Sequence, residues 1–257
     1  MNTEKIIGEA FQLYMPQVRS EITDLTRFLI ENTGLKDGKP INVLEIGTKF
    51  GGTFYIWNKL HEIFATQKDH YSYRLTGKEA IIISIDMTDG GLHGGISAEE
   101  MDKRDSWFAE RFDNCHFIRG DSHHNYTQYL LADKLLFPET PKLYDDTKRN
   151  GSLVIPENTI DFLFIDGDHT YEGVKQDFEM YEKFVKKGGI IAFHDIIISN
   201  EHHERNVYVG EFWKELTRNR MPYEPNVCEI DGNEYEVIEF VEDQNQTWAG
   251  IGVLVKL

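Results

Sequence analysis

Two short apolar runs, each followed by aspartate and histidine, constrain this chain more than any other feature. Residues 160–165 and 190–193 are nearly continuous in apolar side chains, as is typical of parallel strands buried on both faces. The first run leads into Asp166 and His169, and the second into His194 and Asp195. In an open α/β sheet, ligands bind beyond the carboxyl ends of the strands. We therefore expect these four side chains to meet in one crevice.

The segment between the two runs has helical periodicity. From residue 172 onward, Val174, Phe178, Tyr181 and Val185 share one face, and we expect Gly188-Gly189 to end this helix. Strands and helices alternate along the rest of the chain, and two β segments near residues 235–241 and 250–256 form an apparent hairpin. The pattern predicts an α/β fold with a doubly wound, mostly parallel seven-stranded sheet, one antiparallel strand and N-terminal helices.

Length and charge limit the possible functions. The chain has 257 residues, which suits a single domain (1–257) made of an N-terminal helical cap (1–38) and an α/β core (39–257). Its net charge of −17, with no basic patch, opposes nucleic-acid binding. The sequence has no export signal and no apolar run long enough to span a bilayer, so we expect a cytoplasmic location and no membrane partner. A small-molecule acceptor is expected, and a homo-oligomer stays open.

A glycine-containing turn follows the first predicted strand. In residues 44–53, LEIGTKFGGT, Gly47 and Gly51 allow the backbone to approach a ligand at a helix N-terminus. The spacing is not the G-x-G-x-x-G of dinucleotide binders. Asp86 ends the second strand, where an acid usually binds a ribose diol, although residues 65–80 must then be an insertion. With Asp121 and Ser122 after the third strand, the order predicts a nucleoside-containing cofactor.

These motifs resemble a known family. LEIGTKFGGT, SIDM, GDS, FIDGDHTYEGVKQDF and the strand ending in FHD are similar to class I S-adenosylmethionine-dependent methyltransferases, which have a Rossmann-like fold. The nearest group contains cephalosporin-hydroxylase-like and macrolide-sugar O-methyltransferases. The resemblance implies S-adenosylmethionine as the cofactor. It implies that methionine is held at Gly47, Thr48 and Gly51 with Glu45 beneath, ribose by Asp86, and adenine by Met87 and by Asp121 or Ser122.

Methyl transfer to oxygen requires an aligned acceptor and removal of its proton. By the resemblance, His169 matches the general base of some sugar methyltransferases, and Asp166, His194 and Asp195 occupy the positions of the metal ligands in metal-using relatives. His194 departs from the oxygen ligands of magnesium enzymes, since imidazole suits Mn²⁺, Fe²⁺ or Zn²⁺ better than Mg²⁺. A divalent metal (Mg, Mn or Fe) is therefore one possibility. Without it, His194 could be the catalytic base, oriented by Asp195 or Asp166.

The resulting hypothesis is an S-adenosylmethionine-dependent O-methyltransferase acting on a small hydroxylated acceptor such as a sugar or glycosylated metabolite. Two alternatives stay open: a non-catalytic S-adenosylmethionine-binding subunit of a modifying complex, and a nicotinamide-dependent oxidoreductase, which the glycine spacing disfavours. The pairs at 123–124 and 202–203 are interpreted as polar loops, because adjacent side chains on an extended chain point in opposite directions. Asp168 is interpreted as a capping residue.

Overall fold

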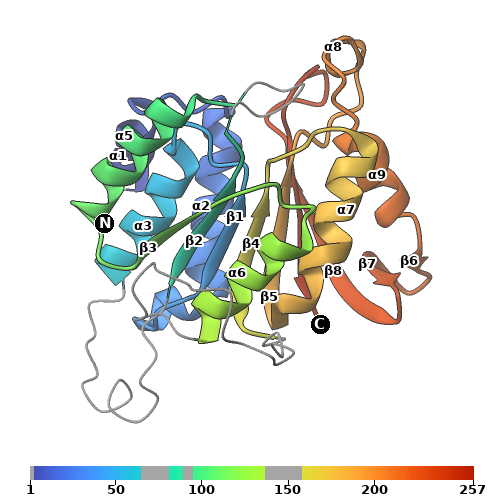
Figure 1. The fold of residues 1–257 in the computed structure, drawn as a ribbon. Coiled ribbons are helices and arrows are strands. Elements are labelled where there is room, and N and C mark those ends of the chain that lie inside the picture. Colours follow the sequence, from blue (N-terminus) through green and yellow to red (C-terminus); the bar gives the residue numbers. More distant parts are fainter. Residues whose placement is uncertain (1–2, 65–80, 89–94, 137–157) are drawn as a thin grey trace.

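The computed structural model describes residues 3–64, 81–88, 95–136 and 158–257 (Figure 1). Its N-terminal part consists of helices α1 (Thr3–Phe11) and α2 (Arg19–Asn32), followed by the short 3₁₀ helix η1 (Gly34–Asp37). These confirm the expected N-terminal helices. The division into a cap over 1–38 and a core over 39–257 stays a prediction.

Five parallel strands form the first half of the sheet. They are β1 (Val43–Ile46), β2 (Ile82–Asp86), β3 (Cys115–Arg119), β4 (Ile160–Ile165) and β5 (Val185–His194), in the spatial order β3-β2-β1-β4-β5. Every residue of β1 is buried, as its apolar run requires. The order reverses at β1, because the chain first builds outward to β3 and then returns to add β4 on the other side.

Helices cover both faces of this sheet. The helices of this region are α3 (Gly52–Phe64), α5 (Ala98–Ala109), α6 (Asn125–Leu136) and α7 (Tyr171–Tyr181). The apolar side chains of α1, α2, α3 and α5 join one core cluster, and those of α6, α7 and the later helix α9 (Val209–Leu216) join the other. Figure 1 shows the sheet between these two layers. The doubly wound α/β fold is confirmed.

The second half of the sheet departs from the expected strand count. The order continues β5-β9-β8-β7-β6, with β9 (Ile251–Lys256), β8 (Asn233–Phe240), β7 (Glu224–Ile230) and β6 (Arg220–Met221), each antiparallel to its neighbours. The described residues thus form nine strands, and both β7 and β9 run against the parallel set, so seven strands with a single antiparallel one was wrong. Asp231 and Gly232 both have positive φ (49° and 80°) and join β7 to β8, as an Asp-Gly hairpin turn does. Few β7 side chains are buried, so its apolar pattern is weak.

The helix before β5 is shorter than predicted. It ends at Tyr181, residues 182–184 form a 3₁₀ turn, and Val185 already belongs to the strand. Gly188, with φ of 75°, lies where the β4–β5 register shifts, so the glycine pair forms an irregularity within β5 and does not cap the helix. Val185 is buried in the same core as the α7 face. Periodicity alone therefore extends the helix too far.

A short helix, α8 (Asn200–Glu204), occupies the segment predicted to be a polar loop around His202 and His203. The Ser199 side chain accepts a hydrogen bond from the His202 N–H and caps it. Ser97 and Glu100 form a capping box at the start of α5. The predicted insertion at 65–80 lies outside the described residues. None of the described helices is both long and apolar enough to cross a membrane.

Candidate active site

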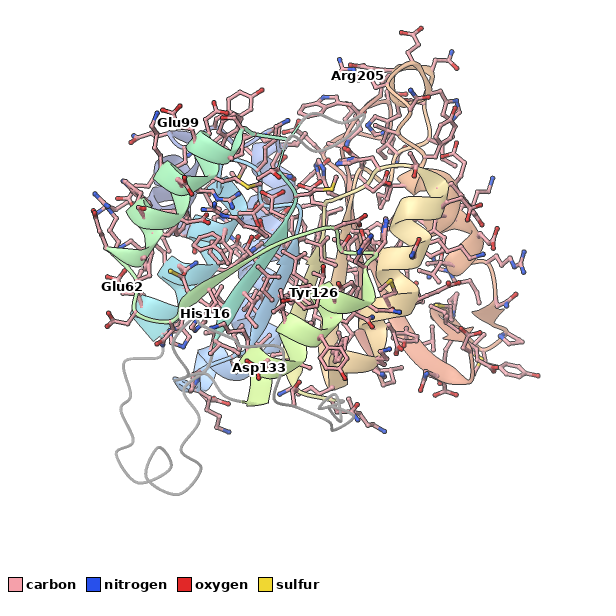
Figure 2. All side chains as sticks on the ribbon, in the orientation of Figure 1. Glu62, Glu99, His116, Tyr126, Asp133 and Arg205 are labelled. Atoms are coloured by element: carbon pink, nitrogen blue, oxygen red, sulfur yellow. The ribbon has the colours of Figure 1, made fainter. Side chains whose placement is uncertain are left out.

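A cavity of about 960 Å³ lies at the carboxyl ends of the parallel strands. Its walls are the segments that follow β1, β2, β3, β4 and β5, together with the turn between α1 and α2 and the region after α8. Arg205, labelled in Figure 2 at the end of α8, belongs to this wall. The cavity therefore opens where the strand order reverses, the expected ligand position in a doubly wound sheet.

The glycine turn after β1 forms one side of the cavity. Gly47 has a φ of 87°, and a Cβ atom there would lie 2.0 Å from the carbonyl oxygen of Asp166. Gly51 also has a positive φ, and a Cβ there would lie 2.6 Å from the Phe108 ring. Thr48 is buried and its hydroxyl contacts that of Ser84. The glycines thus let the turn pass directly over the end of β4, within reach of a ligand.

Glu45 lies beneath this turn and is not part of the cavity wall. It is fully buried, and its carboxylate accepts hydrogen bonds from Thr53 Oγ1 at 2.8 Å and from Trp57 Nε1, both on α3. Burial raises the pKa of Glu45 to about 8, although these donors oppose the rise. The side chain therefore anchors α3 under the turn, and its role in cofactor binding stays a prediction.

Asp86, predicted to bind ribose, lines the cavity at the end of β2. Its Oδ2 lies 2.5 Å from Arg104 Nη1, and its Oδ1 accepts a hydrogen bond from the Met87 N–H. Burial raises the pKa of Asp86, and the Arg104 guanidinium opposes this. None of the sequence motifs indicated Arg104, because its helix lies between the motifs SIDM and GDS.

The turn after β3 completes the predicted cofactor side. Asp121 and Ser122 line the cavity, as does Met87, whose side chain is exposed. His123 does not belong to a loose polar loop, contrary to prediction: its Nε2 lies 3.3 Å from Asp177 Oδ1, a carboxylate of α7 with no exposed surface. The hydrogen bond with Asp177 raises the pKa of His123 to about 9. This ion pair fastens the turn after β3 to α7.

The four residues predicted to meet at the ends of β4 and β5 do so. His169 Nδ1 lies 2.7 Å from Asp195 Oδ2, and His169 Nε2 lies 3.6 Å from Asp166 Oδ1. His194 Nδ1 lies 3.1 Å from Asp166 Oδ1 and 3.3 Å from Asp195 Oδ1. Two carboxylates and two imidazoles thus form one compact cluster on the cavity wall.

The charges in this cluster balance one another. Although burial alone would lower it, the pKa of His194 is raised well above its usual value by the charges of Asp195 and Asp166. Burial would likewise lower the pKa of His169, but the hydrogen bond and charge of Asp195 raise it. Although burial would raise it, the pKa of Asp195 is held well below its usual value by His194 and His169. Both imidazoles therefore have increased proton affinity.

Two neighbours of the cluster were not anticipated as site residues. Gln17, buried in the turn between α1 and α2, donates from Nε2 to Asp166 Oδ2 at 2.9 Å. His202 Nδ1 donates to the Ile197 carbonyl at 2.6 Å, and its Nε2 accepts the Ala249 N–H at 3.1 Å, which assigns it a neutral tautomer. Its Nε2 is also 3.5 Å from Asp195 Oδ1. Gln17 had no sequence signal, and His202 belongs to the histidine pair that was interpreted as a polar loop.

The cluster has the composition of a divalent metal site. Donor atoms of Asp166, His169 and Asp195 all lie within 4.8 Å of one another. Two carboxylates with an imidazole suit Mn²⁺, Fe²⁺ or Zn²⁺ better than Mg²⁺. The predicted metal ligands were Asp166, His194 and Asp195, whereas the histidine of this donor group is His169. The metal-binding role of His194 stays a prediction. Asp168, in contrast, accepts a hydrogen bond from the Thr170 N–H within the turn before α7. The N-cap of α7 is Thr170, whose side chain accepts the Gly173 N–H, so interpreting Asp168 as the helix cap was wrong.

Three solved structures with a similar fold are described as methyltransferases. A putative caffeoyl-CoA O-methyltransferase from Staphylococcus aureus is 14% identical, with a TM-score of 0.56 over 100% of this chain and 93% of that chain. The S-adenosylhomocysteine-bound methyltransferase PaMTH1 of Podospora anserina is 12% identical, with a TM-score of 0.52 over 99% and 87%. The O-methyltransferase TomG of Streptomyces achromogenes, solved with S-adenosylmethionine, is 14% identical, with a TM-score of 0.50 over 98% and 89%. At these identities the likeness shows the fold.

Curated sequence relatives share only parts of their length with this chain. Uncharacterized protein R132 of Acanthamoeba polyphaga mimivirus is 60% identical over 38 residues, 15% of this chain and 17% of that protein. Uncharacterized protein y4gI of Sinorhizobium fredii is 23% identical over 180 residues, 69% of this chain and 15% of that protein. The chain thus matches less than a fifth of either relative.

A family model described as a methyltransferase domain matches residues 44–196, more than half of the chain. The matched region runs from β1 to the residue after Asp195 and therefore contains the glycine turn, Asp86 and the Asp/His cluster. The chain belongs to this methyltransferase-domain family.

Proposed function

We propose that this protein is an S-adenosylmethionine-dependent O-methyltransferase that acts on a small hydroxylated acceptor, such as a sugar or a glycosylated metabolite. One observation carries the proposal: the glycine turn and Asp86 share a single cavity with the His169–Asp195 pair. A methyl donor at the first group and an acceptor hydroxyl at the second would then face each other, as an in-line displacement requires.

The cofactor would lie along the ends of β1, β2 and β3. The turn at Gly47, Thr48 and Gly51 suits the amino-acid end, because the N-terminus of α3 follows it and favours a carboxylate. Asp86 would accept the ribose hydroxyls. Met87, with Asp121 or Ser122, would contact adenine. The fold shared with proteins solved with S-adenosylmethionine or S-adenosylhomocysteine supports this assignment.

His169 would act as the general base. The Asp195 carboxylate, 2.7 Å from Nδ1, orients the ring and raises its proton affinity, so that Nε2 is the atom that would take the acceptor proton. His194, hydrogen-bonded to Asp166, would hold that carboxylate and balance the charge of the cluster, or would take the proton if His169 serves as a ligand.

A divalent metal fits the same cluster. Asp166 and Asp195 would hold it with His169 or His194. Bound there, it would supply Lewis acidity that lowers the pKa of an acceptor hydroxyl. Activity measured after chelation and after addition of Mg²⁺, Mn²⁺ or Fe²⁺ tests this requirement.

The cofactor assignment is tested by thermal unfolding with S-adenosylhomocysteine, with NAD and with neither. A ligand at 100 times its dissociation constant adds about 2.7 kcal/mol to the free energy of unfolding. We expect stabilisation by S-adenosylhomocysteine and none by NAD. The opposite result would reject the proposed cofactor.

The base is tested by methyl transfer from S-adenosylmethionine to a panel of hydroxylated acceptors. For an acceptor that the protein methylates, His169→Ala should lower turnover by at least about 100-fold while S-adenosylhomocysteine binding is retained. His203→Ala is the matched control, because His203 lies on α8 outside the cavity wall and pairs with Glu211. Unchanged turnover in His169→Ala would remove His169 from this role.

A further inference from the structure

One buried arginine, which does not line the cavity, contacts two parts of the proposed cofactor site. Arg104, on α5, has a side chain that is only 4% exposed. Its Nη1 lies 2.5 Å from Asp86 Oδ2 at the end of β2 and donates to the Lys49 carbonyl oxygen of the glycine turn at 2.6 Å. A single guanidinium thus links the end of β2 to the turn after β1.

The guanidinium is itself held in place. Its Nε donates to Asp105 Oδ1 at 2.9 Å, and Asp105 is in turn paired with Arg119 at 2.6 Å. The guanidinium carbon lies 5.0 Å from the centre of the Phe117 ring on β3. Arginine is seldom buried unless it is paired, so a buried guanidinium with this set of contacts is oriented by the fold.

We propose that Arg104 is a positioning residue for the cofactor ribose: it fixes the carboxylate of Asp86 and the backbone of the glycine turn relative to each other, so that the remaining acceptor sites of Asp86 meet the ribose hydroxyls. The inference rests on the proposed function, since it takes Asp86 as the ribose-binding acid. Arg104 acts through Asp86 and Lys49.

Arg104 also controls the charge of Asp86. Burial raises the pKa of Asp86; Arg104 opposes it from α5, and the N–H groups of Met87 and Lys49 oppose it from the backbone. The next charges outward, Asp105 and Arg119, contact Arg104 or each other. Without Arg104, burial would act against the backbone N–H groups alone. The pKa of Asp86 would then rise further, and the carboxylate would be lost as the pH falls.

The test measures calorimetric dissociation constants for S-adenosylhomocysteine and for its 2′-deoxy analogue, at pH 6 and pH 8. We expect Arg104→Gln to weaken S-adenosylhomocysteine binding by about tenfold or more, as loss of an oriented charged hydrogen bond does. The same substitution should weaken binding of the 2′-deoxy analogue by less, because this ligand already lacks one of the two ribose hydroxyls. The loss for Arg104→Gln should be greater at pH 6 than at pH 8.

Two further variants complete the comparison. Arg104→Lys retains the charge, but its single nitrogen cannot replace both Nη1, which contacts Asp86 and Lys49, and Nε, which is held by Asp105. The variant should therefore recover the pH independence and only part of the affinity. If Arg104→Gln does not fold, Arg104→Lys still tests the inference, because its retained charge keeps Asp86 paired. Arg111→Gln is the control: Arg111 lies just beyond α5, is 44% exposed and pairs with Glu110. It should bind as the unmodified protein does.

The outcomes separate the two proposals. If the unmodified protein binds no S-adenosylhomocysteine, the proposed function itself fails. If it binds, and Asp86→Asn weakens binding while Arg104→Gln does not, Arg104 has no positioning role. Equal weakening of both ligands by Arg104→Gln, with no dependence on pH, would also overturn the inference, because it would indicate a general structural loss.

Discussion

Glu45 should make the protein less stable as the pH rises through neutrality. Its carboxyl group is fully buried beneath the glycine turn and has a pKa of about 8, against 4.5 for an unperturbed glutamate. Between these two values the folded protein retains the proton and the unfolded chain has released it. The folded state then binds more protons, so the free energy of unfolding falls with increasing pH.

The magnitude follows from the two pKa values. A tenfold difference in proton affinity is worth about 1.36 kcal/mol, so the difference of about 3.5 between pKa values of about 8 and 4.5 corresponds to a limit of about 5 kcal/mol. Of this, about 3 to 4 kcal/mol should be lost between pH 5 and pH 8. Glu45→Gln removes the titration. Its amide can accept from Trp57 and donate to the Thr53 hydroxyl, which retains both contacts.

The assay is urea unfolding of the unmodified protein and of Glu45→Gln at several pH values from 5 to 9. As the pH rises over this range, the free energy of unfolding of the unmodified protein should fall by about 3 to 4 kcal/mol relative to that of Glu45→Gln, because all other titrations are common to both proteins. Glu179→Gln, on the exposed face of α7, is the control and should show a constant difference. A constant difference for Glu45→Gln as well would refute the reasoning, because Glu45 would then have the same pKa in the folded and unfolded states.

Two more predictions concern the cavity wall. Gly47→Ala should abolish S-adenosylhomocysteine binding and lower the melting temperature by more than Gly188→Ala does. Both glycines have positive φ, which costs a substituted alanine about 1 to 2 kcal/mol, but only at Gly47 would the new Cβ overlap a backbone oxygen, that of Asp166. Equal decreases in melting temperature for the two variants, measured by differential scanning fluorimetry, would contradict this. The stabilising His123–Asp177 pair should be fully present below the usual histidine pKa of 6.5 and lost as the pH rises through about 9. In an NMR titration, Asp177→Asn should return the His123 pKa toward 6.5, and an unchanged pKa would show that Asp177 is not the cause.

Much of the candidate site was predictable because it lies at the ends of strongly patterned strands. The apolar run of β4 is followed directly by Asp166 and His169, and that of β5 by His194 and Asp195. Once the strands are parallel and adjacent, chain geometry brings these ends together, and the contacts in the structure confirm it. Gly47 was predictable for the same reason, since it ends β1 beside β4.

Boundaries and edge strands were less predictable. The end of α7 was misplaced because Val185 is apolar whether it extends a helix or begins a strand, and only pairing with Ile160 makes it part of β5. The edge strand β6 and its neighbour β7 were missed because both bury few side chains, although the turn at Asp231 and Gly232 was a usable signal.

By itself, the amino-acid sequence determined the alternation of strands and helices, the parallel core and the residues at each strand end, because these depend on local periodicity and on chain connectivity. Only the tertiary structure decided which side chains reach those ends from elsewhere. Gln17 contacts Asp166 across 149 positions of sequence. Arg104 contacts Asp86 from the buried face of α5, and local periodicity does not indicate which residue that face meets. Such contacts depend on how helices dock on the sheet, and docking is determined by packing between segments that no local pattern relates.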